Sequence, residues 1–129
     1  DVPLGTFLSG GIDSSIITAI AANNTAHINT FSIGYKDEPL FDETRFALLV
    51  AKKYKTNHTV FELTNDDLFE NLFDVLDYLD EPFADSSALA VSILSKFTRK
   101  HVTVALSGDG ADELFAGYNK HAALYRAAN

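Results

Sequence analysis

The sequence predicts an α/β fold in which a parallel sheet carries helices on both faces. Short segments rich in β-forming residues alternate along the chain with helix-like stretches of about 10–15 residues, the pattern of strands joined by crossover helices. Several of the strand-like segments end at a glycine or a glycine-containing turn. With 129 residues, 47% hydrophobic and 22% charged, the chain has the size and composition of one folded domain rather than a disordered segment.

The first strand is predicted at residues 5–8, a short apolar segment that stops at a Ser-Gly-Gly turn. Residues 13–22 have helical character, with three isoleucines on one side. The second strand is expected at residues 29–33, where β-forming residues alternate up to Gly34. The polar residues 34–41, which include a proline, predict a loop.

The middle of the chain predicts two helices around a third strand. Residues 42–54 have apolar side chains at helical spacing and two acids in the first turn, which is typical of a helix start. Residues 58–63 are expected to form the third strand. Thr64 or Asn65 then caps a helix that reaches Leu79 and carries a continuous apolar stripe.

The last third of the chain predicts two more helices and a fourth strand. A loop at residues 80–85 precedes a helix at 87–98, whose end is followed by basic residues that suit the helix dipole. Val102, Val104 and Leu106 indicate the fourth strand, and the chain from about residue 111 to its end is expected to be helical.

Composition excludes several functions. No apolar run approaches 18 residues, so we expect no membrane-spanning helix and no membrane partner. Cysteine is absent, which excludes disulfides and cysteine nucleophiles. The net charge of −8 disfavours nucleic acid as a partner. The N-terminus has neither an initiating methionine nor the features of a signal peptide, so we expect a piece of a cytoplasmic protein.

Residues 9–15, Ser-Gly-Gly-Ile-Asp-Ser-Ser, lie between the first strand and the first helix. Two glycines allow a sharp turn, and the amides and hydroxyls at a helix start form an anion site. Asp13 would repel a phosphate in this site unless a cation lay between them, which predicts Mg²⁺. A plain turn with Asp13 as a helix cap is the alternative. The segment matches neither the Walker A loop nor the dinucleotide fingerprint.

Residues 107–118, Ser-Gly-Asp-Gly-Ala-Asp-Glu-Leu-Phe-Ala-Gly-Tyr, again follow a strand and open a helix. If the two segments are neighbours on the sheet, Asp13 and Asp112 would share a cation while Ser107 and Gly108 face the ligand. The alternative is a glycine-rich turn with solvated acids. Four further acids, Asp77, Asp80, Glu81 and Asp85, are either solvated or face the same cleft.

At these segments the sequence resembles the synthetase domain of glutamine-dependent asparagine synthetases, which are N-type ATP pyrophosphatases with a PP-loop. The resemblance also includes Val-Pro-Leu-Gly at 2–5, Thr-Phe-Ser-Ile-Gly at 30–34 and Asp-Glu-Pro-Phe-Ala-Asp at 80–85. It spans nearly the whole chain in order. It implies the PP-loop ATP pyrophosphatase fold, which is adenine nucleotide alpha hydrolase-like and Rossmann-like, for residues 1–129 as one partial synthetase domain.

The resemblance implies ATP and Mg²⁺ as cofactors and β-aspartyl-AMP chemistry. The aspartate side chain attacks the α-phosphorus of MgATP, pyrophosphate leaves, and ammonia derived from glutamine displaces AMP to give asparagine. The residues implied to bind ATP are Leu8, Ser9, Gly10, Gly11, Asp13, Ser14, Ser15, Ile33, Ser107 and Gly108. Asp13 and Asp112 are implied to bind the metal.

Asp109 is implied to be catalytic, although many members of the family carry Glu at this position. The shorter side chain suggests a relative that amidates a different carboxylate, such as a sugar acid or a β-lactam precursor. The family's N-terminal glutaminase domain, with its catalytic Cys, and a catalytic Lys nearer the C-terminus lie outside this chain. A nucleotide-binding module without turnover is therefore the alternative for the isolated piece, and a homodimer stays open.

Overall fold

The four strands form one parallel sheet, as the sequence predicts. The computed structural model describes residues 2–81 and 85–128. The strands are β1 (Leu4–Phe7), β2 (Asn29–Tyr35), β3 (Asn57–Leu63) and β4 (Val104–Leu106). They lie in the order β3-β2-β1-β4, and each neighbouring pair is parallel. The predicted α/β class is confirmed.

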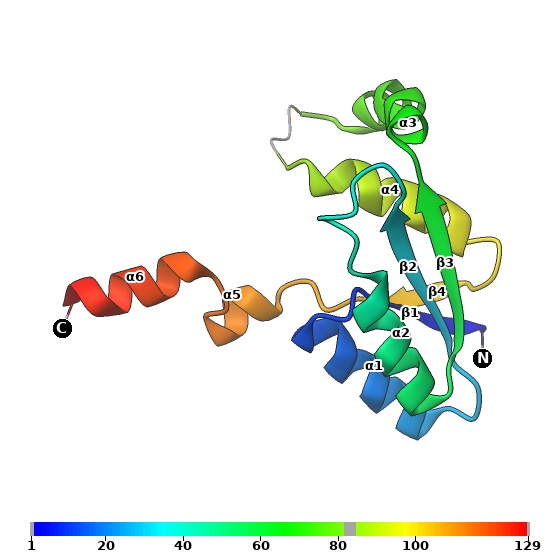
Figure 1. The fold of residues 1–129 in the computed structure, drawn as a ribbon, viewed down its shortest axis with the longest axis horizontal. Helices are drawn as coiled ribbons and strands as arrows, with labels where there is room; N and C mark the ends of the chain where they lie inside the picture. The colour runs from blue at the N-terminus through cyan, green and yellow to red at the C-terminus, as the bar shows by residue number, and fades with distance from the viewer. Residues whose placement is uncertain (1, 82–84, 129) are drawn as a thin grey trace.

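Helices cover both faces of this sheet, which also confirms the prediction (Figure 1). The helices are α1 (Ile12–Asn24), α2 (Thr44–Tyr54), α3 (Asn65–Tyr78), α4 (Ser87–Thr98), α5 (Ala111–Phe115) and α6 (Asn119–Ala128). Helices α1 and α2 contact each other and the strands of one face, whereas α4 contacts β2 and also packs against α3. The chain runs from β1 through β2 to β3 and then returns past β1 to reach β4. The order in which the chain adds strands therefore reverses between β1 and β4. Ligands bind at such a switch point in folds of this kind.

The two faces of the sheet differ in chemistry because side chains alternate along a strand. On the α4 face, Phe31 is fully buried and stacks on Phe61, and Phe61 stacks on Phe97 of α4. On the other face, Thr6 of β1 is fully buried and hydrogen-bonds Thr18 of α1 at 2.8 Å. The core is thus aromatic on one side of the sheet and rich in hydroxyl groups on the other.

In two helices, much of the apolar stripe faces solvent rather than the core. In α1, Ile16 and Ile20 are more than half exposed, and the buried residues are Thr18 and Ala21. Thr18 faces the sheet because the Thr6 hydroxyl there offers a partner. In α3, Val75 is the buried residue while much of the predicted stripe is exposed.

The helix predicted from residue 111 onwards is interrupted. Helix α5 ends at Phe115, Ala116 adopts the left-handed conformation with φ of 57°, and α6 starts at Asn119. These two helices extend away from the body as an arm (Figure 1). No residue of α5 or α6 is buried.

Other boundaries move by at most two residues. Helix α2 begins at Thr44 rather than at residue 42, because the Asp42 carboxylate accepts a hydrogen bond from the Thr44 amide at 2.9 Å. Thr64 caps α3, and its hydroxyl and amide exchange hydrogen bonds with Asp67. Within the described residues, no helix combines the length and apolar character needed to cross a membrane.

Candidate functional site

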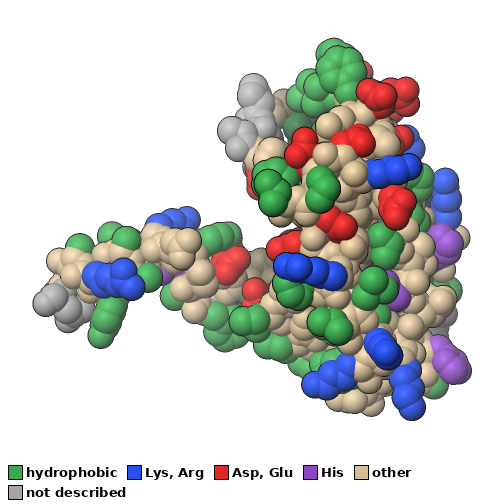
Figure 2. Space-filling model, in the orientation of Figure 1, with side chains coloured by type: hydrophobic (Ala, Val, Ile, Leu, Met, Phe, Trp, Pro, Cys, Tyr) green, Lys and Arg blue, Asp and Glu red, His purple; other side chains and the backbone are tan. Residues whose placement is uncertain are grey.

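A cavity of about 740 Å³ opens at the carboxyl ends of β1, β2 and β4. Its wall is formed by the loops after β1 and β4, the start of α2 and the start of α4. Six carboxylates line it: Asp13, Glu43, Asp85, Asp109, Asp112 and Glu113. Figure 2 shows acidic side chains along the recess where the arm leaves the body. Among the described lining residues there is no Lys or Arg, so a phosphate ligand would need a cation here.

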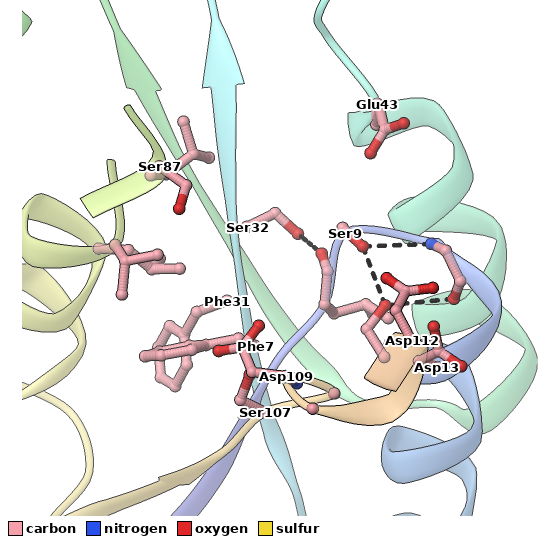
Figure 3. Close-up of a pocket in the computed structure, with 18 of the residues that line it drawn as sticks. Phe7, Ser9, Asp13, Phe31, Ser32, Glu43, Ser87, Ser107, Asp109 and Asp112 are labelled. Carbon is pink, nitrogen blue, oxygen red and sulfur yellow. Dashed lines mark hydrogen bonds between the residues drawn. The ribbon is translucent and has the colours of Figure 1, made fainter. Parts of the chain in front are cut away.

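The loop after β1 is held by its own hydrogen bonds (Figure 3). The Ser9 hydroxyl contacts the Ser14 hydroxyl at 3.0 Å and accepts from the Gly11 amide at 3.2 Å. Ser14 also donates to the Gly11 carbonyl at 3.2 Å. Gly11 is the residue that precedes α1, and Asp13 lies in the first helical turn. The alternative of Asp13 as the helix cap is therefore wrong.

Gly10 shapes this loop without lining the cavity. Its φ is +90°, and a Cβ atom at this position would lie 2.5 Å from the Ala47 amide nitrogen and 2.5 Å from the Phe46 Cβ of α2. Glycine here lets the loop pack directly on α2. The lining residues include Leu8, Ser9, Gly11, Asp13 and Ser14, but not Gly10 or Ser15.

The loop after β4 lies against the first loop, which confirms that the two segments are neighbours. A Cβ atom on Gly108 would come within 2.9 Å of the Ser14 amide nitrogen and 3.1 Å of the Asp13 Cβ. The Ser107 hydroxyl accepts a hydrogen bond from the Asp109 amide at 3.1 Å. Segments almost a hundred residues apart in the chain therefore meet at the switch point between β1 and β4, where the strand order reverses.

Asp13 and Asp112 line the same cavity from these two neighbouring segments, and Figure 3 draws both on the α1 side of it. Carboxylate oxygens suit Mg²⁺, which is usually bound by one or two carboxylates together with substrate phosphates and water. In the described part of the chain, no three or more His, Cys, Asp or Glu side chains form a group that could hold a metal ion. The cavity thus offers two carboxylates from the neighbouring loops, and a metal ion bound by them would need further ligands from a substrate or from water.

Gly117 lies directly against the Asp112 carboxylate. A Cβ atom on Gly117 would overlap the Asp112 Oδ1 atom. The Gly117 amide also donates to the Asp112 carbonyl at 3.0 Å, so the turn after α5 folds back over this aspartate. The turn thereby restricts the position of one carboxylate of the candidate metal site.

Tyr118 and Glu113 close the arm side of the cavity. The Tyr118 hydroxyl donates to the Glu113 carboxylate at 2.5 Å. This bond lowers the pKa of Glu113 and raises the pKa of Tyr118 to about 12, because the carboxylate stabilises the phenol proton. Both groups are fixed in their ordinary neutral-pH charge states, so neither is set up to exchange a proton near pH 7.

The apolar side chains of the cavity come mainly from the α4 face of the sheet. Phe7, Phe31, Ile33 and residues of α4 line it. Leu8 also lines the cavity, but its side chain is 1% exposed and packs with Ala47 and Ala51 of α2. Leu8 can therefore offer its backbone rather than its side chain to a ligand.

Of the four acids with two open interpretations, Asp85 lines the cavity, while Asp77, Asp80 and Glu81 are exposed and do not line it. Residues 82–84 of that motif lie outside the described residues. Sequence patterns did not single out Ser32, Glu43, Ser87 and Tyr118, which also line the cavity. A hydroxyl or acid in an ordinary strand or helix start gives no signal of its own.

Known proteins resemble the chain in sequence and in fold. The family described as asparagine synthase matches residues 1–129. A Methanocaldococcus jannaschii protein named as glutamine-hydrolysing asparagine synthetase 2 is 43% identical over 129 residues, covering 98% of this chain and 24% of the relative. The glutamine-hydrolysing asparagine synthetase 1 of Bacillus subtilis is 40% identical, covering 92% of this chain and 19% of the relative. The chain thus spans about a fifth to a quarter of the length of these relatives.

Among solved structures, an NH3-dependent NAD synthetase from Campylobacter jejuni in complex with nitrate has a similar fold. The TM-score is 0.55 at 15% identity, over 90% of this chain and 51% of that one. At this identity the likeness concerns the fold alone.

Proposed function

The chain belongs to the asparagine synthase family, and from this premise we propose that it forms the ATP-binding part of an ATP-dependent amide ligase. In the proposed reaction, the side-chain carboxylate of aspartate attacks the α-phosphorus of ATP and pyrophosphate leaves. Ammonia from glutamine then displaces AMP from β-aspartyl-AMP to give asparagine. We further propose that the glutaminase domain and the rest of the acceptor site belong to a longer protein, in keeping with the greater length of the relatives.

The observation that carries the proposal is the contact between the loops after β1 and β4. This contact brings the amides at the start of α1 and two carboxylates to one cavity. In this proposal the Ser9 and Ser14 hydroxyls and the Gly11 amide, which hydrogen-bond to one another within the loop, bind the leaving pyrophosphate. Gly10 and Ser15 belong to the same loop, Gly10 acting through its packing on α2. A positive helix start at the leaving group favours bond cleavage because charge accumulates there.

Asp13 and Asp112 would hold Mg²⁺, which neutralises the charge that develops on the phosphates. Without this ion, the six carboxylates of the cavity would repel a nucleotide polyphosphate. The adenosine would lie on the apolar side, against Ile33 and the backbone of Leu8, with Ser107 and Gly108 completing the nucleotide site. Asp109, exposed at the mouth beside Ser107, would act on the acceptor.

The experiment that tests this proposal is a calorimetric titration of ATP into the protein, once with Mg²⁺ and once with EDTA. We expect binding only with Mg²⁺, because Asp13 and Asp112 otherwise face phosphates of like charge. Asp13→Asn should weaken MgATP binding by about tenfold or more, as is usual when a metal site loses a ligand or its support. Asp66→Asn is the matched control, since Asp66 is exposed in the first turn of α3, outside the cavity. Equal affinity with Mg²⁺ and with EDTA would contradict the two-aspartate site.

A further inference from the structure

The carbonyl at the entrance to the loop after β1 is held by a buried side chain of β2. The Ser32 hydroxyl donates a hydrogen bond to the Leu8 carbonyl (Figure 3). The Leu8 amide in turn donates to the Phe31 carbonyl at 2.8 Å. Leu8, the residue directly before the Ser-Gly-Gly turn, is therefore fixed to β2 through both its amide and its carbonyl. Ser32 is 4% exposed and lies in β2, and it lines the cavity at the edge of the sheet.

The Ser32 hydroxyl has one proton and two neighbours that could take it. One neighbour is the Leu8 carbonyl and the other is the His58 Nε2 atom of β3, 3.5 Å from the Ser32 oxygen. If Nε2 carried no hydrogen, it would compete with Leu8 for the serine proton. If Nε2 carries the hydrogen, it donates towards Ser32, and the serine proton stays on Leu8.

The other side of the imidazole has a partner that fits the second arrangement. His58 Nδ1 lies 2.8 Å from the Thr30 hydroxyl, and Thr30 lies 2.8 Å from the Thr56 hydroxyl. In the Nε2–H form, Thr56 donates to Thr30, Thr30 donates to Nδ1, and Nε2–H points to Ser32. Each group in this chain then donates its hydrogen bond to the next one, and the last acceptor is the Leu8 carbonyl. Burial lowers the pKa of His58 and outweighs the opposite effect of a hydrogen bond to the Thr30 backbone, which agrees with a neutral ring in either tautomer.

We propose that Ser32 is a positioning residue for the phosphate-binding loop, and that His58 in its Nε2–H form keeps the Ser32 proton on Leu8. The role of the loop rests on the proposed function, whereas the hydrogen-bond chain does not. Ser32 does not contact the reacting atoms in this proposal. It sets where the loop leaves the sheet, and therefore where the Ser9 hydroxyl and the Gly11 amide lie relative to the phosphates.

The test compares Ser32→Ala with Thr6→Val. Thr6 is also a buried hydroxyl, on the neighbouring strand; it hydrogen-bonds Thr18 and is not among the residues that line the cavity. Both variants should lose similar stability in chemical denaturation. We expect only Ser32→Ala to weaken MgATP binding, by about tenfold, the factor that one ordinary hydrogen bond represents. Equal weakening in both variants would overturn the proposal, because the effect would then come from general destabilisation.

Two measurements without nucleotide separate this proposal from the proposed function. Hydrogen exchange of the amides at residues 9–11 should be faster in Ser32→Ala and unchanged in Thr6→Val. The nitrogen chemical shifts of the His58 ring should show the hydrogen on Nε2. Unchanged exchange in Ser32→Ala, or a hydrogen on Nδ1 instead, would overturn the positioning role. If wild-type protein fails to bind MgATP while both measurements hold, the proposed function fails and the positioning of the loop by Ser32 stands.

Discussion

Asp109 is the residue at which the family resemblance leads us to expect a glutamate instead. Its amide is tied to the Ser107 hydroxyl, and its carboxylate is exposed at the mouth of the cavity. A glutamate at this position would reach farther by one carbon–carbon bond, about 1.5 Å. In a positioned reaction, a displacement of about 1 Å can change the rate by ~100-fold. The shorter side chain therefore has to match a larger acceptor or an inward-shifted loop if Asp109 is catalytic.

We predict that Asp109→Glu, made in the longer protein that we propose, lowers activity on its native acceptor. If that acceptor is not aspartate, the same change should improve the use of aspartate, because the longer side chain reaches a smaller substrate. The measurement is kcat/KM for pyrophosphate release with each candidate carboxylate. Identical kinetics for all acceptors would show that Asp109 is a solvated loop acid, and its catalytic role would have to be abandoned.

At the scale of elements, the turn between α5 and α6 restricts the position of Asp112, one carboxylate of the proposed metal site. We predict that Gly117→Ala weakens Mg²⁺-dependent ATP binding by about 10- to 100-fold, the range found when a group that supports a metal ligand is changed. The reason is that the added methyl group overlaps the Asp112 Oδ1 atom, so the carboxylate or the turn has to move. Stability should change little, because no residue of α5 is buried. The measurement is calorimetric titration of Mg²⁺ in the presence of ATP.

The control for this prediction is Ala116→Gly in the same turn. Ala116 has φ of 57°, a conformation that glycine adopts without strain, so this variant keeps the turn and relieves its backbone. It should bind Mg²⁺ and ATP as the wild type does. If both variants lose binding equally, the flexibility of the turn matters rather than the contact between Gly117 and Asp112.

The sequence predicted every strand and most helices because each has its own periodicity, but it did not predict the break after α5. Leu114 and Phe115 continue a helix-like pattern, and a single glycine lowers helix stability by only about 1 kcal/mol. The two loops of the candidate site were predictable, since each places glycines directly after a strand. Ser32 was not, because a serine in an alternating strand has no distinguishing pattern. Its importance arises only when β1 and β2 pair and bring the Leu8 carbonyl within reach.

At the scale of the whole molecule, the topology rather than any single motif assembles the site. Helices α1 and α2 lie on one face and α4 lies on the other, so the chain crosses the sheet before it forms β4 beside β1. The cavity then lies at the carboxyl ends of the two strands, with charge from both loops. The net charge of −8 adds to the local excess of carboxylates, so the cation that we propose would contribute to charge balance as well as to chemistry.

The same topology divides the molecule into a packed body and a weakly supported arm, and we predict that hydrogen exchange will separate them. Strand β2 lies inside the sheet, with Thr30 and Phe31 fully buried, whereas α6 has ten residues and none of them buried. A helix of that length is marginal in water when packing does not support it. Backbone amides of α6 should therefore exchange at least ~100-fold faster than those of β2, because local opening costs far less in the arm than unfolding the sheet.

Mass spectrometry of peptides from the two segments measures this difference. Protection of α6 equal to that of β2 would contradict the prediction, and a loss of that protection on dilution would show that a second copy covers the arm.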